Sequence, residues 1–81
     1  MFGRRAAPVV EPGVIPDNIT RRVKVLPTAD LVEWGDQAIY TTGRYLTLWQ
    51  RRQEPSDLEE ARVGAQVLMA IVDEITVRSA L

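Results

Sequence analysis

Carboxylates are the side chains in this sequence that are best suited to chemistry, because cysteine and histidine are both absent. Their absence removes the thiolate nucleophile, the commonest general base and the commonest neutral metal ligand. The carboxylates form three close groups, Asp30 with Glu33, Glu59 with Glu60, and Asp73 with Glu74. None has the Glu-x-x-His spacing of helical metal sites. We therefore expect these groups to complement helix dipoles and to face solvent, and we predict no metal and no cofactor.

The other polar groups with catalytic potential have structural roles available to them. Ser56 begins an S-x-x-E motif that ends at Glu59, which is the capping box of a helix N-terminus. Tyr40 falls on the polar side of a helical segment, where a surface contact is the expected role. The five glycines are scattered and form no phosphate-binding loop. We therefore predict that the protein is not an enzyme and has no catalytic residue and no small-molecule substrate.

The length of 81 residues allows one small domain. A chain of this size buries only about 60% of its unfolded surface, so its stability usually needs reinforcement. Disulfides are excluded, and a partner chain is the reinforcement that remains. No apolar run approaches the roughly 20 residues of a bilayer span, and the N-terminus does not have the pattern of a signal peptide. A cytoplasmic location is expected.

Residues 1–27 are the basic part of the chain, with five basic and two acidic residues. Within residues 1–18 a proline recurs every four positions, which excludes a helix, since each proline disfavours the α region for the residue before it. The valine and isoleucine residues between the prolines indicate an extended arm that lies along a groove. An N-terminus without fixed structure is the alternative.

Residues 19–26, ITRRVKVL, have the alternation of a short strand. One face would carry Ile19, Val23 and Val25, and the other would carry Thr20, Arg22 and Lys24. β-branched residues are common in strands. A single strand has no hydrogen-bonding partner of its own, so we expect it to pair with a second copy or another protein, or to stay irregular.

Residues 28–81 form an acidic part with the periodicity of two helices. Apolar residues recur at helical spacing over 29–53 and over 57–78, and Pro55 separates the two segments. Glu74 and Arg78 have the i,i+4 spacing of a favourable ion pair. A short connection places two such helices side by side and antiparallel. The predicted fold class is therefore all-α in the main, with an extended proline-rich arm and a short strand before an antiparallel two-helix hairpin.

Both predicted helices carry more apolar surface than one contact between them covers. The first has an apolar arc of about 200°, whereas a surface helix typically has about 100°. The second has, besides its main stripe, a thinner stripe of Val63, Val67, Ala70 and Val77. Two helices form a single seam and do not enclose a core. A partner layer must therefore complete the fold, supplied by a second hairpin, a different protein or the chain's own arm.

Protein–protein interaction is the function that this excess of apolar surface predicts. The chain would be a small subunit that self-associates, or an adaptor that docks a wide helical face onto a larger complex. Aromatic residues dominate interface energies, and the thinner stripe of the second helix is otherwise uncovered. The predicted partner-binding residues are Trp34, Tyr45, Trp49, Val63, Val67 and Val77. The three aromatic residues fit a plain core equally well.

A second interpretation rests on VKVLPTADLVEWGDQAIYTTGR, residues 23–44. This stretch resembles the ribbon-helix-helix DNA-binding proteins, in which a basic strand leads through Leu-Pro into a helix, a Thr-Gly turn and a second helix. The resemblance implies a dimer whose paired strands enter the major groove of DNA. It also implies that Thr20, Arg22 and Lys24 contact bases and that Thr42-Gly43 is the turn. An exposed strand edge, protected by its positive charge, is the alternative role of the three residues.

Overall fold

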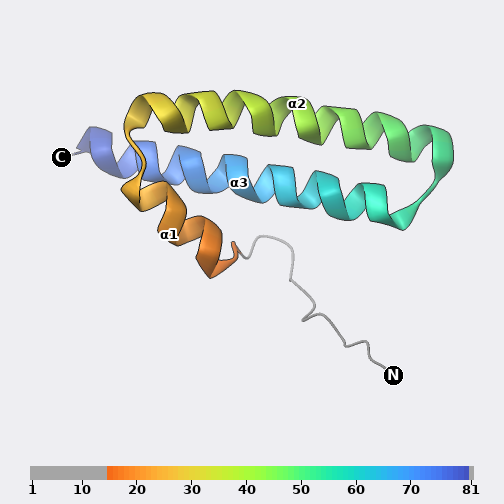
Figure 1. The fold of residues 1–81 in the computed structure, drawn as a ribbon, viewed down its shortest axis with the longest axis horizontal. Helices are drawn as coiled ribbons and strands as arrows, with labels where there is room; N and C mark the ends of the chain where they lie inside the picture. Colours follow the sequence, from red (N-terminus) through yellow and green to blue (C-terminus); the bar gives the residue numbers. More distant parts are fainter. Residues whose placement is uncertain (1–14, 81) are drawn as a thin grey trace, which may run out of the picture.

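Three helices and the short connections between them make up residues 15–80, the part of the chain that the computed structural model describes. Helix α1 spans Asp17–Val25, α2 spans Thr28–Arg52 and α3 spans Pro55–Ala80. Helices α2 and α3 lie side by side and antiparallel, and α1 packs beside the C-terminal half of α3 (Figure 1). The mainly helical fold class predicted from the sequence is confirmed.

Residues 19–26 were predicted to form a strand, and this prediction is wrong, because all but the last of them belong to helix α1. Ile19 and Val23 are four residues apart, so the spacing that suits one face of a strand also suits one face of a helix. Both are buried, in the same core cluster as Val67 and Ala70 of α3. Helix α1 thus covers part of the thinner stripe of α3. Of the predicted arm, residues 1–14 lie outside the described part, and residues 17 and 18 begin α1.

Small residues allow α2 and α3 to approach closely along their seam. Gly35 of α2 lies beside the side chain of Ile71, and Gly64 of α3 lies against Ala38 and Thr42. Small residues at such positions bring helix axes together. The core cluster comprises Ile19, Val23, Leu31, Ala38, Val67, Ala70 and Ile71. The core is therefore a narrow band along one side of each long helix.

Helix α2 runs without a break through Thr42 and Gly43. The Thr42 hydroxyl donates a hydrogen bond to the Ala38 carbonyl at 2.7 Å, one turn earlier in the same helix. The turn that the ribbon-helix-helix resemblance places at these two residues is therefore absent. Because the predicted strand is also helical, the described part of the chain does not have the ribbon-helix-helix arrangement.

A two-residue connection, residues 53–54, joins α2 to α3. Gln53 has a left-handed backbone with φ 56°, and its N–H donates a 2.7 Å hydrogen bond to the Trp49 carbonyl, which closes α2. Pro55 then takes the first position of α3, where its fixed φ suits a helix and its missing N–H leaves no bond unmade. Helix α3 therefore begins two residues before the predicted start at about residue 57, and Ser56, which was predicted to cap the helix, lies inside its first turn.

An ion pair across this connection ties the two long helices together. Asp57 is only 2% exposed, and its carboxylate accepts two hydrogen bonds from Arg52, at 3.2 Å from Nε and 2.5 Å from Nη2. A bidentate pair of this kind fixes the geometry as well as the charge. The hydrogen bonds to Asp57 raise the pKa of the Arg52 guanidinium, because they stabilise its charged form.

Arg78 joins all three helices at the other end of the molecule. Its guanidinium donates to the Val23 carbonyl at 3.1 Å and to the Leu26 carbonyl at 2.6 Å, where α1 ends. It also donates to the Thr28 hydroxyl at 2.9 Å, at the start of α2. The predicted i,i+4 pair with Glu74 is confirmed, at 3.0 Å. A cation here satisfies carbonyls that the last turn of α1 leaves without an intrahelical donor.

Candidate interaction surface

Exposed apolar side chains form a surface along one side of the α2–α3 pair. Three residues of this surface on each helix are seven apart, which changes their direction by only about 20° per step, and Met69 lies between two of them on α3. The set, to which we refer as the open face, comprises Val32, Ile39 and Leu46 of α2 and Leu58, Ala65, Met69 and Val72 of α3. Its six larger side chains are between 37% and 55% exposed.

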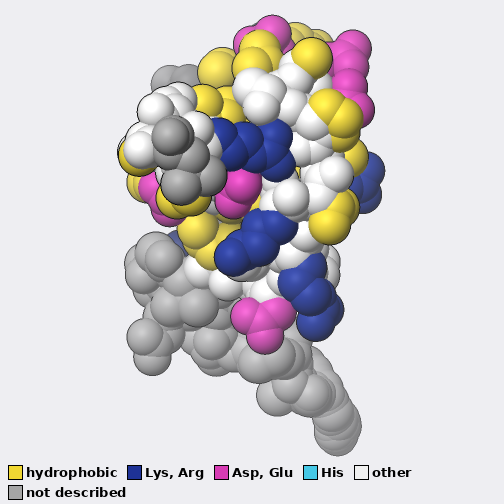
Figure 2. All heavy atoms as spheres, turned by 90° about the vertical axis from the view of Figure 1, so that its left-hand side faces the viewer, with side chains coloured by type: hydrophobic (Ala, Val, Ile, Leu, Met, Phe, Trp, Pro, Cys, Tyr) yellow, Lys and Arg dark blue, Asp and Glu magenta, His cyan; other side chains and the backbone are white. Residues whose placement is uncertain are grey.

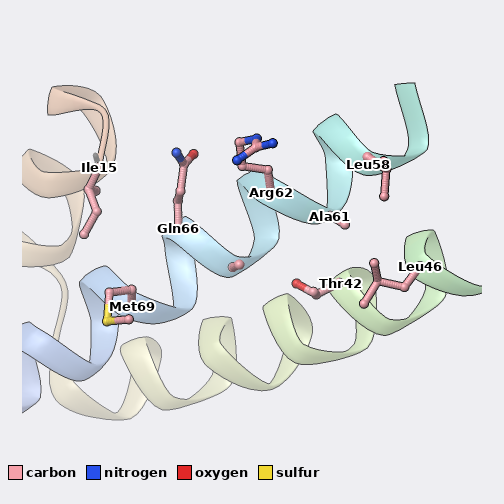
Figure 3. Close-up of a pocket in the computed structure, with 9 residues that line it drawn as sticks. Ile15, Thr42, Leu46, Leu58, Ala61, Arg62, Gln66 and Met69 are labelled. Atoms are coloured by element: carbon pink, nitrogen blue, oxygen red, sulfur yellow. The ribbon is translucent and has the colours of Figure 1, made fainter. Parts of the chain in front are cut away.

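A groove of about 500 Å³ joins the two halves of the open face. Leu46 of α2 lines it together with Leu58, Ala65 and Met69 of α3, so residues of both helices belong to one surface. Figure 3 shows Leu46 and Leu58 on facing sides of the two helices, near the connection between them. Ile15, just before α1, lies at the opposite end of the groove.

Helix α1 packs on a different side of α3. The α3 residues buried beneath it, Val67 and Ala70, lie about 140–200° around the helix from Val72, at 100° per residue. The open face and the α1 contact therefore use separate surfaces of α3. The dimensions of the molecule, 46 × 29 × 17 Å, agree with helices arranged in little more than one layer.

Charged residues along the edges of the open face are separated by sign. On the flank of α2 beside the open face, the exposed acids Glu33 and Asp36 precede the middle of the helix, and the exposed bases Arg44 and Arg51, which line one surface depression with Ile39, follow it. Figure 2, which looks onto the end where α2 begins, shows acidic side chains over that helix at the top of the view. On α3 the two charged residues nearest the open face follow the same order, with Asp73 towards this end and Arg62 towards the other. The exposed acids Glu59 and Glu60 also lie at the Arg62 end, but they point about 120–140° away from Ala65.

Arg62 and Asp73 project from the same flank of α3, because eleven residues correspond to almost three whole turns. The only ion pair of Arg62 among the described residues is a 3.7 Å contact with Glu59, whose side chain is 70% exposed. Such a surface pair contributes little. Asp73 is exposed and forms no ion pair within residues 15–80. Both charges are therefore available to a partner.

The aromatic residues predicted as partner contacts are half-buried in the packing of the chain itself. Trp34 packs against the core cluster, and the Arg22 guanidinium stacks over its ring at 5.0 Å. Tyr45 and Trp49 are also partly buried. On α2, Trp34 and Tyr45 lie about 120–140° from the stripe through Ile39, so they belong to the other side of the seam.

The three predicted valine contacts have different surroundings. Val63 and Val77 are exposed, but they lie outside the open face. Val67 is 7% exposed and is a core residue, because α1 packs over it. The structure therefore does not bring the six predicted contact residues together on one surface. In the sequence, the signal for the open face is the seven-residue spacing of apolar residues on each helix. On α2 these residues lie at the edge of the apolar arc opposite to Trp34 and Tyr45.

The three residues assigned to nucleic acid by the ribbon-helix-helix resemblance do not form a row. On a helix, Thr20 and Lys24 share one side, and Arg22 points about 160° away from it. Arg22 stacks on Trp34, and the Thr20 hydroxyl donates to the Pro16 carbonyl at 3.3 Å. Lys24 is exposed.

No family model, curated protein or solved structure matches this chain. In residues 15–80, no helix has the length and apolar character that a bilayer crossing requires. The same residues contain no group of three or more metal-ligating side chains. The surface properties of the three helices are therefore the basis for assigning a function.

Proposed function

We propose that this protein is a small interaction subunit whose open face packs against another protein chain. The extent of exposed apolar surface on an arrangement little more than one helix thick carries the proposal. On each helix the open face spans 14 residue steps, from Val32 to Leu46 and from Leu58 to Val72, or about 21 Å at 1.5 Å per residue. Packed helices lie about 8–10 Å apart, so the open face measures on the order of 400 Å². Apolar patches of about 300–600 Å² are the largest on typical monomers and are often functional.

The energy available from covering the open face is large for a domain of this size. Its six larger side chains are roughly half exposed. Full burial of such a side chain contributes about 1.5–3 kcal/mol, so covering the exposed half of each contributes about 5–9 kcal/mol in all. The net stability of a domain is about 5–15 kcal/mol. A partner on this face would therefore change the stability of the chain substantially.

Site-specific crosslinking tests the proposal on the full-length chain in its native cells. A photoreactive phenylalanine analogue replaces Ile39 on the open face, and in a matched variant it replaces Gln37. Gln37 is exposed and lies two residues earlier, about 160° around α2. We expect ultraviolet light to convert the Ile39 variant, but not the Gln37 variant, to a protein adduct heavier than 9.1 kDa.

Equal crosslinking from both positions, or none from Ile39, would refute the proposal. A second probe position, Met69, guards against an unfavourable orientation at Ile39, because it lies on the other helix of the same face. An adduct with nucleic acid instead of protein would refute the proposal and favour a DNA-binding function. Circular dichroism of each purified variant shows whether the helices are retained.

A further inference from the structure

We infer that the open face binds a second copy of this chain, with α2 packed antiparallel on α2 and α3 antiparallel on α3. This inference rests on the proposed function, because it names the occupant of the same surface. Three properties support it, namely the symmetry of the apolar residues of the open face, the separation of charge along its edges and the area of the side of the helix pair that carries it.

Except for Met69, the apolar residues of the open face are arranged symmetrically about one line across it. Ile39 lies midway between Val32 and Leu46 on α2, and Ala65 lies midway between Leu58 and Val72 on α3. The two midpoints are at the same level along the molecule, because Gly64, next to Ala65, contacts Ala38 and Thr42 on either side of Ile39.

A single twofold axis along this line would therefore relate α2 to the partner's α2 and α3 to the partner's α3. It would place Val32 opposite Leu46 of the partner subunit, and Ile39 opposite its own equivalent. Such self-complementarity is what a twofold interface requires, since the same patch is used on both copies. The result is a four-helix arrangement with two packed layers, which encloses a core that one pair of helices lacks.

The charges select the antiparallel direction. In this direction Glu33 and Asp36 on the flank of α2 lie towards Arg44 and Arg51 on the flank of the partner's α2. A twofold axis parallel to the helices would instead bring acidic ends together. Like charges placed opposite one another disfavour association.

Arg62 and Asp73 supply a specific pair for the antiparallel direction. When the axis lies at the level of Ala65, Arg62 of one copy is about 7 Å along the helix direction from Asp73 of the partner subunit, at 1.5 Å per residue. Side chains on a helix lean towards its N-terminus, so in antiparallel copies these two lean towards each other. An arginine side chain is long enough to span the gap, and symmetry produces the pair twice.

The side of the α2–α3 pair that carries the open face is large enough for a stable dimer. Contact along the full length of both helices, about 37 Å by 19 Å, would cover about 700 Å² on each copy. The total of about 1,400 Å² is within the 1,200–2,000 Å² of specific protein–protein interfaces. Sedimentation equilibrium of the purified full-length chain, from about 1 to 200 µM, measures the result directly. We expect a mass of about twice 9.1 kDa. Ile39→Lys should give a folded monomer, and the matched Gln37→Lys variant should remain a dimer.

Charge reversal tests the pairing itself. Arg62→Glu and Asp73→Arg should each raise the dissociation constant roughly 2- to 30-fold, because each replaces two attractive surface pairs by repulsive ones. Mixing the two single variants should restore association to within about threefold of the original chain. In the mixed dimer Glu faces Arg in one pair, and the native Asp73 faces the native Arg62 in the other. An intramolecular role for either residue would not produce this recovery.

A monomer throughout the concentration range overturns the inference, as does a dimer that Ile39→Lys leaves intact or a mixture that does not recover. The proposed function is judged separately. If Ile39 crosslinks to a different protein while the chain alone is monomeric, the open face is an interaction surface and the second copy is wrong. If neither an adduct nor a dimer forms, both proposals are wrong.

Discussion

Adding one methyl group at Gly64 should destabilise this protein, although glycine-to-alanine changes within a helix usually have the opposite effect. A Cβ at this position would overlap the Thr42 hydroxyl and lie 3.3 Å from the Ala38 carbonyl oxygen. The hydroxyl is held in place by its 2.7 Å hydrogen bond to that carbonyl, so α2 and α3 would have to move apart. Overpacking costs about 1–3 kcal/mol, and alanine returns about 1 kcal/mol of helix propensity.

We expect Gly64→Ala to lower the free energy of unfolding by up to about 2 kcal/mol, or the melting temperature by up to about 15 °C. Gly43→Ala is the matched control on α2, where a Cβ would have no atom within 4 Å. It should raise the free energy of unfolding by about 0.5–1 kcal/mol. Urea unfolding followed by circular dichroism at one fixed protein concentration measures both, because association contributes to apparent stability.

A double-mutant cycle then locates the cause. Thr42→Ala removes the overlapping hydroxyl, so Gly64→Ala should cost at least about 1 kcal/mol less in the Thr42→Ala background than in the original chain. If Gly64→Ala instead stabilises the protein as much as Gly43→Ala does, the two long helices do not approach as closely as the structure shows.

Three further substitutions test other parts of the fold. Leu31→Ala should lower the free energy of unfolding in urea by about 2–5 kcal/mol, because Leu31 is 0% exposed, and a loss below 1 kcal/mol would contradict its place in the core. Gln53→Gly should raise the same quantity by about 0.5–1 kcal/mol, because glycine adopts the φ of 56° at little cost; a decrease would argue against a left-handed cap. Arg78→Ala should speed amide hydrogen exchange in residues 17–25 well before that of residues 35–71, and uniform acceleration of both segments would mean that Arg78 does not hold α1 specifically.

The long helices show what periodicity in a sequence is able to predict. Apolar spacing predicts a helix over 29–53, and α2 spans Thr28–Arg52. A segment of this length contains many repeats, so a residue such as Gly43 does not outweigh the remainder. Local spacing was sufficient for the Glu74–Arg78 pair as well, because i,i+4 neighbours lie together on any helix. The additional bonds from Arg78 to α1 join residues more than 50 apart in sequence, which local spacing does not indicate.

Short segments do not contain enough repeats to distinguish a strand from a helix. In residues 19–26 the alternation includes Val25, which fits a strand, but the structure leaves Val25 exposed and buries the i,i+4 pair Ile19 and Val23. The prolines decide the outcome. Pro16 and Pro27 stand immediately before α1 and α2, and a helix can begin after a proline far more easily than it can continue through one. The segment is therefore a short helix bounded by two prolines.

The location of the interaction surface depends on packing that the sequence does not specify. An apolar arc of about 200° on α2 limits which residues face α3, but either edge of the arc could lie in the open. The structure places Trp34 at the edge beside α1, where Arg22 covers it, and leaves Ile39 at the other edge. Helix α1 thus supplies one part of the layer that the two long helices need. Because it packs on a different side of α3 from Val72, it leaves the open face exposed.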